Sequence, residues 1–301
     1  MKFILSPLIL LLLVAGCKKD TPGSPGENNP DSVSIITQAL YYQTNLAAAP
    51  DTISVNYNAD HRIEKINQAY HSSPGIGTWT FTYNANGTIA NVKGGRLYWE
   101  SKQDYYLYYN NSKRLDSLLI NDVSFDGDSV RLKNVYTYDA NSHIKSSYTI
   151  VSNGGTSTGF YTGDTIAKAV FSFSNDIDSV NYNLYSYQHI NTDPPVTNVF
   201  TSADAVHFNK TVVDISTLDN SLLFWLSIKS NVYAPLNLFN PFWYQYINPD
   251  ILMARGGTIN TETYDFSTTK SVNGDIAVVS FVDARGAYSR LIKLAYTRIP
   301  Y

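Results

Sequence analysis

The chain has little of several things that would identify a function quickly. Among its 301 residues are one cysteine, two methionines and five histidines, and only 16% of the residues are charged. A single cysteine excludes an intrachain disulfide, so burial and hydrogen bonds must hold the fold together. With 22 basic against 25 acidic side chains, the formal net charge is −3. A mildly acidic chain without a basic patch is not expected to bind nucleic acid.

Recognisable chemistry is also scarce. There is no Walker loop, no Gly-x-Gly-x-x-Gly and no His-Glu-x-x-His. His61 and His143 fall in expected turns, and no histidine has a partner at zinc-ligand spacing. Paired acids at 126/128 and 176/178 lack the further ligands that calcium needs. We therefore expect no catalytic residue, metal or cofactor, although two distant carboxylates of a glycosidase would leave no local signature.

Long apolar runs are confined to the N-terminus. Residues 1–16 have the layout of a signal peptide, with Lys2 near the start, an apolar run from Ile4 to Val14, and small residues before Cys17. The apolar run is too short to span a bilayer, which takes about 20 residues. Its end resembles the lipobox of bacterial lipoproteins, which implies that Cys17 is acylated and becomes the mature N-terminus. More than one acyl chain gives stable membrane attachment.

Residues 17–35 are expected to form a flexible tether, because the stretch from Lys18 to Asp31 contains no large apolar side chain. Its start resembles that of lipoproteins from Bacteroidetes-type bacteria. This resemblance implies an outer-membrane lipoprotein, facing either the periplasm or the cell surface. Residues 36–301 are predicted to form a single β-rich domain.

What the chain has in abundance is tyrosine, with 24 residues. Four of them recur at intervals of 26, 26 and 29 residues, and each is followed by Asn or Asp: Tyr57, Tyr83, Tyr109 and Tyr138. A fixed period of this size marks one supersecondary unit used repeatedly. The repeat occupies residues 50–150.

Each repeat predicts a β-hairpin. Residues before the tyrosine alternate between apolar and polar, as in a strand with one buried face. The Asn or Asp after the tyrosine favours a type I turn. Three residues later a left-handed residue followed by a bulge would complete the hairpin, at His61, Gly87, Lys113 and Ser142. The chain then re-enters a strand at Ile63, Ile89, Leu115 and Ile144.

These hairpins resemble the Tyr-Asp (YD, Rhs-type) repeat. In the context of the leader they also resemble the uncharacterised Bacteroidetes lipoproteins with DUF4595-like domains of unknown function. The resemblance covers the leader and residues 50–150. It implies a curved half-barrel sheet in the cell envelope, and it implies no activity and no catalytic residues.

Beyond residue 150 the pattern loosens. Polar residues at 219–221 followed by the apolar run Leu222–Lys229 predict one short helix. An aromatic loop is expected between Pro241 and Pro249. Together these make an insertion over residues 205–250 that covers one face of the sheet. The predicted fold is all-β: an antiparallel meander of hairpins in a curved open sheet or half barrel, with one helix and an aromatic loop packed on it.

Aromatic side chains are the only binding signal. The candidate ligand-binding residues are Trp79, Trp99, Tyr106, Tyr108, Trp243 and Tyr244. Because faces alternate along a strand, Tyr106 and Tyr108 point away from Tyr105 and Tyr109. One face must be core. The other is either covered by a second layer or exposed as a platform for sugars or other flat ligands.

A recurrent Asp-Ser/Thr-aliphatic tripeptide resembles the acceptor motif of protein O-glycosylation in Bacteroidetes envelopes. Its candidate hydroxyls belong to Ser32, Thr52, Ser117, Ser129, Thr165 and Ser179. The alternative is structural, because Asp ends a turn where Ser or Thr and an aliphatic residue open a strand.

These patterns predict a non-enzymatic envelope lipoprotein with a binding or scaffold role, anchored to the outer membrane through lipid. Its partner would be a glycan, a lipid or another envelope protein. A carrier of an apolar ligand in a half-barrel hollow and a carbohydrate-active enzyme with an unrecognised carboxylate pair remain as alternatives.

Overall fold

A computed structural model of the chain describes residues 32–43, 49–71, 75–95, 103–125, 128–153, 162–163, 165–173, 179–190, 196–208, 218–228, 246, 257–259, 262–283 and 289–300. Cys17 and the rest of the predicted leader lie outside these residues. So do Trp99, Trp243 and Tyr244.

The described elements are strands throughout, apart from one helix. In chain order they are β1 (Ser32–Gln43), β2 (Asp51–Tyr57), β3 (Ile63–Ala69), β4 (Ile76–Tyr83), β5 (Ile89–Gly95), β6 (Gln103–Tyr109), β7 (Leu115–Phe125), β8 (Asp128–Tyr138), β9 (Ile144–Asn153), β10 (Thr165–Phe173), β11 (Ser179–Ile190), β12 (Val196–Phe208), α1 (Asn220–Ile228), β13 (Gly257–Ile259), β14 (Glu262–Lys270), β15 (Ile276–Asp283) and β16 (Ser289–Pro300).

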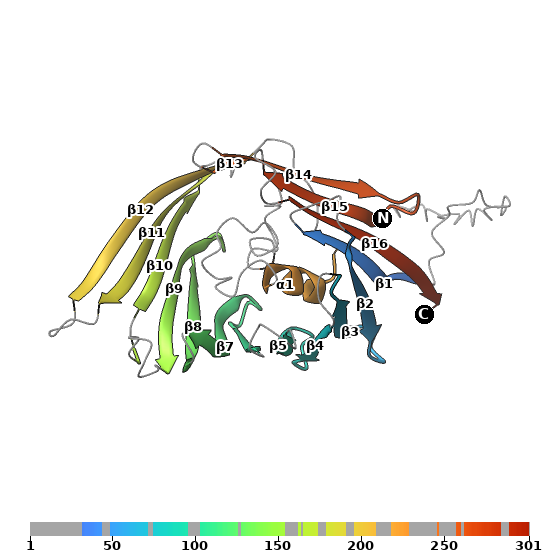
Figure 1. The fold of residues 1–301 in the computed structure, drawn as a ribbon, viewed down its shortest axis with the longest axis horizontal. Helices are drawn as coiled ribbons and strands as arrows, with labels where there is room; N and C mark the ends of the chain where they lie inside the picture. Colours follow the sequence, from blue (N-terminus) through green and yellow to red (C-terminus); the bar gives the residue numbers. More distant parts are fainter. Residues whose placement is uncertain are drawn as a thin grey trace, which may run out of the picture.

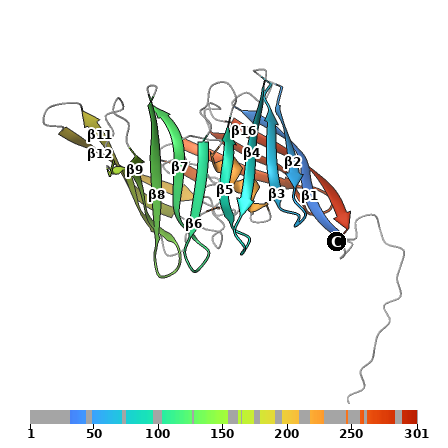
Figure 2. The ribbon, with the colours of Figure 1, turned by 90° about the horizontal axis from the view of Figure 1, so that it is seen from below.

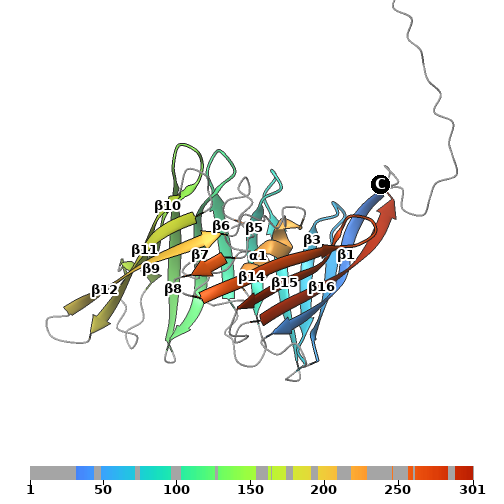
Figure 3. The ribbon, with the colours of Figure 1, turned by 90° about the horizontal axis from the view of Figure 1, so that it is seen from above.

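Each strand pairs antiparallel with the next one along the chain, so the sheet is the predicted meander (Figure 1). The strands from β2 to β8 stand side by side on one wall (Figure 2), and β14 to β16 run across the opposite side (Figure 3). The predicted all-β class, the curvature and a helix packed on the sheet are confirmed.

One long-range pairing adds to this picture. β1 pairs with β2 on one side and with β16 on the other, so the order of strands closes on itself. The strand pairing is shortest at β13, where only the segment Gly257–Ile259 connects β12 to β14 through backbone hydrogen bonds. Without this short strand, the rest would be the open curved sheet that the repeats predict.

The repeat turns have the predicted geometry. His61, Gly87, Lys113 and Ser142 adopt φ values of 57°, 88°, 59° and 69°. The register shifts by one residue just before each repeat tyrosine, as a bulge requires. In the first turn the Asn58 side-chain oxygen accepts hydrogen bonds from the backbone N–H groups of Asp60 and Arg62, both at 3.0 Å. The Asn or Asp after the tyrosine therefore holds the turn from within.

A further turn of the same kind lies near the C-terminus. Gly274 has a φ of 85°, and its N–H donates to the Ser271 carbonyl at 3.0 Å. Lys270 stands where the other repeats have tyrosine. This turn was not predicted from the sequence, because the tyrosine that identifies the other repeats is replaced by lysine.

The repeat tyrosines join one hairpin to the hairpin before it. The Tyr83 hydroxyl donates to the Ile63 carbonyl at 2.5 Å, and the Tyr138 hydroxyl donates to the Leu115 carbonyl at 2.7 Å. The Tyr109 hydroxyl is hydrogen-bonded to the backbone of Ile89. Each partner is the first residue of the strand that follows the previous turn. Each bond therefore connects a repeat tyrosine to the repeat before it.

The helix α1 lies inside the curve of the sheet (Figure 1). Asp219 caps it, because its carboxylate accepts from the Ser221 N–H at 2.7 Å. The helix is apolar on all sides, and its residues from Ser221 to Ile228 are buried. Trp225 packs edge-to-face on Tyr41 of β1 and Trp79 of β4, at ring distances of 6.1 and 5.7 Å. The core is therefore the space between the walls.

The outward side of the repeat wall is different. On β2 to β5 the outward positions carry Ser54, Asn56, Lys65, Thr82 and Lys93, all exposed. Inward positions on the same strands are buried and apolar, such as Ile53, Ile66 and Val92. Strands that face lipid have the reverse alternation, although Ile76 at the start of β4 is also exposed.

Among the described residues, no helix combines the length and apolar character needed to cross a membrane.

Three features differ from those predicted from the sequence. β1 begins at Ser32, so the strand includes residues predicted to be tether, because Ser32 to Ile35 pair with β16. β12 was not predicted, and it pairs with β11 along its whole length from Val196 to His207. The helix was predicted at Leu222–Lys229 and is found at Asn220–Ile228.

Candidate functional site: a pocket between two repeat turns

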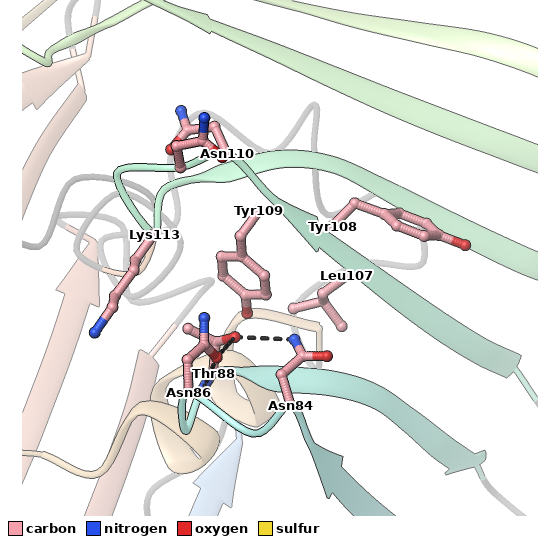
Figure 4. Close-up of a pocket in the computed structure, with 9 residues that line it drawn as sticks. Asn84, Asn86, Thr88, Leu107, Tyr108, Tyr109, Asn110 and Lys113 are labelled. Atoms are coloured by element: carbon pink, nitrogen blue, oxygen red, sulfur yellow. Dashed lines mark hydrogen bonds between the residues drawn. The ribbon is translucent and has the colours of Figure 1, made fainter.

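A pocket of about 470 Å³ lies at the rim between the β4–β5 turn and the β6–β7 turn (Figure 4). This volume falls in the usual range for small-ligand sites, roughly 300 to 1,000 Å³. The lining is mostly polar and comes from both turns and from the end of β6: Asn84, Asn86, Thr88, Leu107, Tyr108, Tyr109, Asn110, Asn111 and Lys113.

The repeat itself produces an opening at this point. Pairing between β5 and β6 ends at Asn91 and Tyr106, so the two hairpins separate beyond that pair. The same happens one repeat earlier, where β3 and β4 stop pairing at Lys65 and Thr80. We call each such opening a junction notch: the space between two successive repeat turns, bounded by the second tyrosine.

In the notches on either side, an arginine covers the tyrosine ring. The Arg62 guanidinium lies 5.5 Å from the Tyr83 ring centre, and that of Arg114 lies 5.7 Å from the Tyr138 ring centre. Thr88 occupies the corresponding position in the middle notch. Its side chain is too short to lie over Tyr109, so the middle notch stays open as the pocket.

The amides around the pocket are held in place. The Thr88 hydroxyl donates to the Asn86 side-chain oxygen at 2.8 Å and accepts from the Asn84 amide nitrogen at 2.9 Å. The Asn110 side-chain oxygen accepts from the backbone N–H groups of Ser112 and Arg114. Figure 4 shows these side chains on opposite sides of Tyr109. A ligand here would meet polar groups that are already oriented.

Tyr109 forms the inner limit of the pocket and contacts the insertion. Its hydroxyl lies 2.7 Å from the hydroxyl of Tyr246, and the Tyr246 ring packs on Phe224 of α1. Burial raises the pKa of Tyr109 to about 12, although its hydrogen bond to Tyr246 acts in the opposite direction. The raised pKa keeps Tyr109 in its neutral form near pH 7.

Tyr108 and Tyr106 lie on the outward face of β6. Tyr108 is 51% exposed and borders the pocket, whereas Tyr106 is half-buried. The sequence left open whether the second face of this strand is covered or exposed, and at Tyr108 it is exposed. Trp79, another of the candidate ligand-binding residues, is 3% exposed and packs on Trp225, so its side chain belongs to the core.

The hydroxyls of the Asp-Ser/Thr-aliphatic motif are spread over the sheet. Ser32, Thr52 and Thr165 are half-buried, and Ser117 is buried; the side chains of Ser129 and Ser179 lie outside the described set. Strands begin at the motif in five places: β1, β2, β8, β10 and β11. The structural explanation of the motif thus applies, and glycosylation stays a prediction.

The described residues show few other signs of a metal-binding or catalytic site. No group of three His, Cys, Asp or Glu residues there could hold a metal, and the residues lining the pocket include no carboxylate. Gly155–Gly159 has the Gly-x-Ser-x-Gly spacing of a hydrolase nucleophile, which stands between a strand and a helix in that fold. Here it falls between the antiparallel strands β9 and β10, outside the described residues.

No family model and no curated protein matches the chain. Solved structures that align with it include a porin-like protein from Bacteroides uniformis, at 11% identity and a TM-score of 0.47, covering 87% of this chain and 96% of that one. A porin-like protein from Bacteroides vulgatus aligns at 10% identity and a TM-score of 0.49, covering 87% and 98%. The Tc holotoxin pore of Photorhabdus luminescens aligns at 8% identity and a TM-score of 0.25, covering 79% of this chain and 14% of that one.

Tyr108 was predicted from the sequence as a candidate ligand-binding residue, but the amides of the pocket were not. The available signal was a break in the repeat, since Arg62 and Arg114 have Thr88 between them at the same spacing. This break becomes meaningful only when the neighbouring arginines are seen to cover tyrosine rings.

Proposed function

We propose that this protein is a non-enzymatic binding module of the cell envelope, and that the middle junction notch binds a saccharide. The observation that carries the proposal is the pocket between two repeat turns, with fixed amides on both sides and the exposed ring of Tyr108 at its edge.

The chemistry of the lining suits a sugar. Saccharides offer closely spaced hydroxyl groups, and oriented side-chain amides can donate to and accept from such groups. A sugar ring also has an apolar face, which can pack against an aromatic ring that keeps a polar tip in water. Tyr108 lines the same pocket as Asn84 and Asn110, so one ligand could use both kinds of contact.

The two alternatives have less support. A carrier for an apolar ligand needs a hollow, but the interior beside β1, β4 and β6 is filled by Phe224 and Trp225, which are fully buried. A carbohydrate-active enzyme needs two facing carboxylates, and the pocket is lined by none.

The envelope location is part of the proposal and rests on the leader. If Cys17 is acylated, the segment from Lys18 to Asp31 would connect the lipid to β1, which begins at Ser32. The domain would then stand in the aqueous space beside an outer membrane, which agrees with the polar outward side of β2 to β5.

A glycan array probed with the full-length protein, purified in detergent, tests the proposal. We expect binding to a defined set of glycans, and Tyr108→Ala should weaken it about tenfold or more, since a lost stacking contact is worth roughly 1–3 kcal/mol. Tyr42→Ala is the matched control, because Tyr42 lies on distant β1 with Lys293 over its ring. Absence of binding to every glycan would refute the proposed function.

A further inference from the structure

Two of the four asparagines that line the pocket have no acceptor left for a ligand. An amide oxygen has two lone pairs. The Asn110 oxygen uses both on the N–H groups of Ser112 and Arg114, at 3.0 and 3.1 Å. The Asn86 oxygen uses both on the backbone N–H and the hydroxyl of Thr88, at 3.1 and 2.8 Å. Both amides therefore have only their NH₂ groups left for a ligand.

The one charge in the pocket has the same preference. Lys113 is exposed, lines the pocket, and makes no ion pair with any residue that the structure describes. An ammonium group offers three donors and no acceptor. Figure 4 shows Lys113 on the β6–β7 turn, with its side chain directed towards the opposite turn that carries Asn86.

From the single positive charge and these two donor amides we infer that the ligand of the middle junction notch is an acidic saccharide, whose carboxylate or sulfate is held by Lys113 with the amides of Asn86 and Asn110. The inference rests on the proposed function and specifies its ligand class. Hydrogen bonds to charged groups are shorter and about twice as strong as neutral ones, so the acidic group would supply much of the affinity.

The neighbouring repeats provide variants that change this property with little risk to the fold. In the first turn Asp60 stands where Asn86 stands, and in the fourth turn Asp139 stands where Asn110 stands. Both turns form normally, and the Asp139 carboxylate accepts from the His143 N–H at 2.8 Å. Asn86→Asp and Asn110→Asp should thus keep the turns while replacing a donor with a negative charge.

The probes are oligogalacturonate and oligoguluronate, each paired with its carboxyl-reduced form, in which the acid becomes a neutral alcohol on the same sugar backbone. Binding to the full-length protein in detergent is measured by calorimetry at low and high salt. We expect at least one acidic oligomer to bind at least about tenfold more tightly than its reduced form, with affinity falling as salt rises.

Among the variants, Lys113→Gln should weaken binding of the acidic oligomer about tenfold, and Asn86→Asp with Asn110→Asp should abolish it. Lys65→Gln, an exposed lysine on β3, should leave it unchanged. Equal binding of the acidic and reduced forms, with no effect of Lys113→Gln, would overturn the inference and leave the saccharide proposal standing. If the glycan array has also found no ligand, the proposed function itself fails.

Discussion

Thr88→Arg is the substitution that most directly tests how the pocket arises. In the notches on either side, Arg62 and Arg114 lie 5.5 and 5.7 Å from a tyrosine ring centre. An arginine at position 88 starts from the same place in the repeat. We expect its guanidinium to lie over Tyr109 and close the pocket, while Lys113, which is exposed, turns away from the new charge.

The expected change in stability is small. An exposed cation–π contact contributes about 0.5–1 kcal/mol. Against this, the variant loses the hydrogen bonds of the Thr88 hydroxyl to Asn84 and Asn86, each worth roughly 0.5–1.5 kcal/mol. The net change should stay within about 2 kcal/mol, which corresponds to a shift in Tm of no more than about 8 °C for a domain of this size.

Binding, by contrast, should fall sharply. A ligand would first have to displace the guanidinium and would then find less space, so we expect a loss of at least about tenfold, or ~1.4 kcal/mol. Calorimetric titration measures the loss, and thermal unfolding of the same sample shows that the fold is intact. A Thr88→Arg protein that is folded and binds with the original Kd would refute the pocket as the site.

Three further predictions concern the fold. Tyr83 and Tyr109 have pKa values of about 12 in the folded protein, raised chiefly by burial, against about 10 when unfolded. Because the folded state holds these protons to higher pH, the contribution of the two tyrosines to stability should be constant below pH 10 and fall between pH 10 and 12. Urea unfolding at stepped pH measures this change, and tyrosines that titrate near 10 would contradict it. Trp225→Ala should cost about 3–5 kcal/mol in chemical denaturation, because the indole is fully buried against two aromatic rings; a cost below about 1 kcal/mol would mean that α1 is not part of the core. Gly94→Ala should destabilise much more than Gly274→Ala in the same assay, because a Cβ at Gly94 would lie 2.0 Å from a backbone oxygen of β4, whereas at Gly274 it meets nothing within 4 Å; similar costs at the two positions would contradict the close approach of β4 and β5.

The local structure of the repeats could be predicted, because its causes are local. The turn at His61, for example, depends on Asn58 and on a left-handed residue three positions later, all within one short segment. The helix was predictable for the same reason, since Asp219 and the apolar run after it are adjacent in sequence. Features that depend on contacts between residues far apart in the chain were not predicted.

Closure of the ring is one such case. Nothing in residues 32–43 indicates that they pair with residues 290–300, and the first four residues of β1 were assigned to the tether because their partner strand lies at the other end of the chain. Trp79 is another. It was named as a candidate ligand-binding residue, but the packing of Trp225 on its ring places its side chain in the interior.

The pocket exists because the repeat does not require an arginine over every tyrosine ring. Each junction is already fixed by the tyrosine hydroxyl, which reaches the first residue of the preceding strand, and at the middle junction Tyr109 keeps its bond to Ile89 without any arginine above it. The arginine is thus dispensable for the fold, and position 88 can lose it while the hairpins keep their spacing. Once it is lost, the notch exposes side chains that the turns hold for their own reasons, and the oxygens of Asn86 and Asn110 are already engaged in those turns. The donor character of the pocket therefore depends on the asparagines at positions 86 and 110, and Arg62→Thr should open the first notch without giving it that character, because Asp60 stands there in place of Asn86.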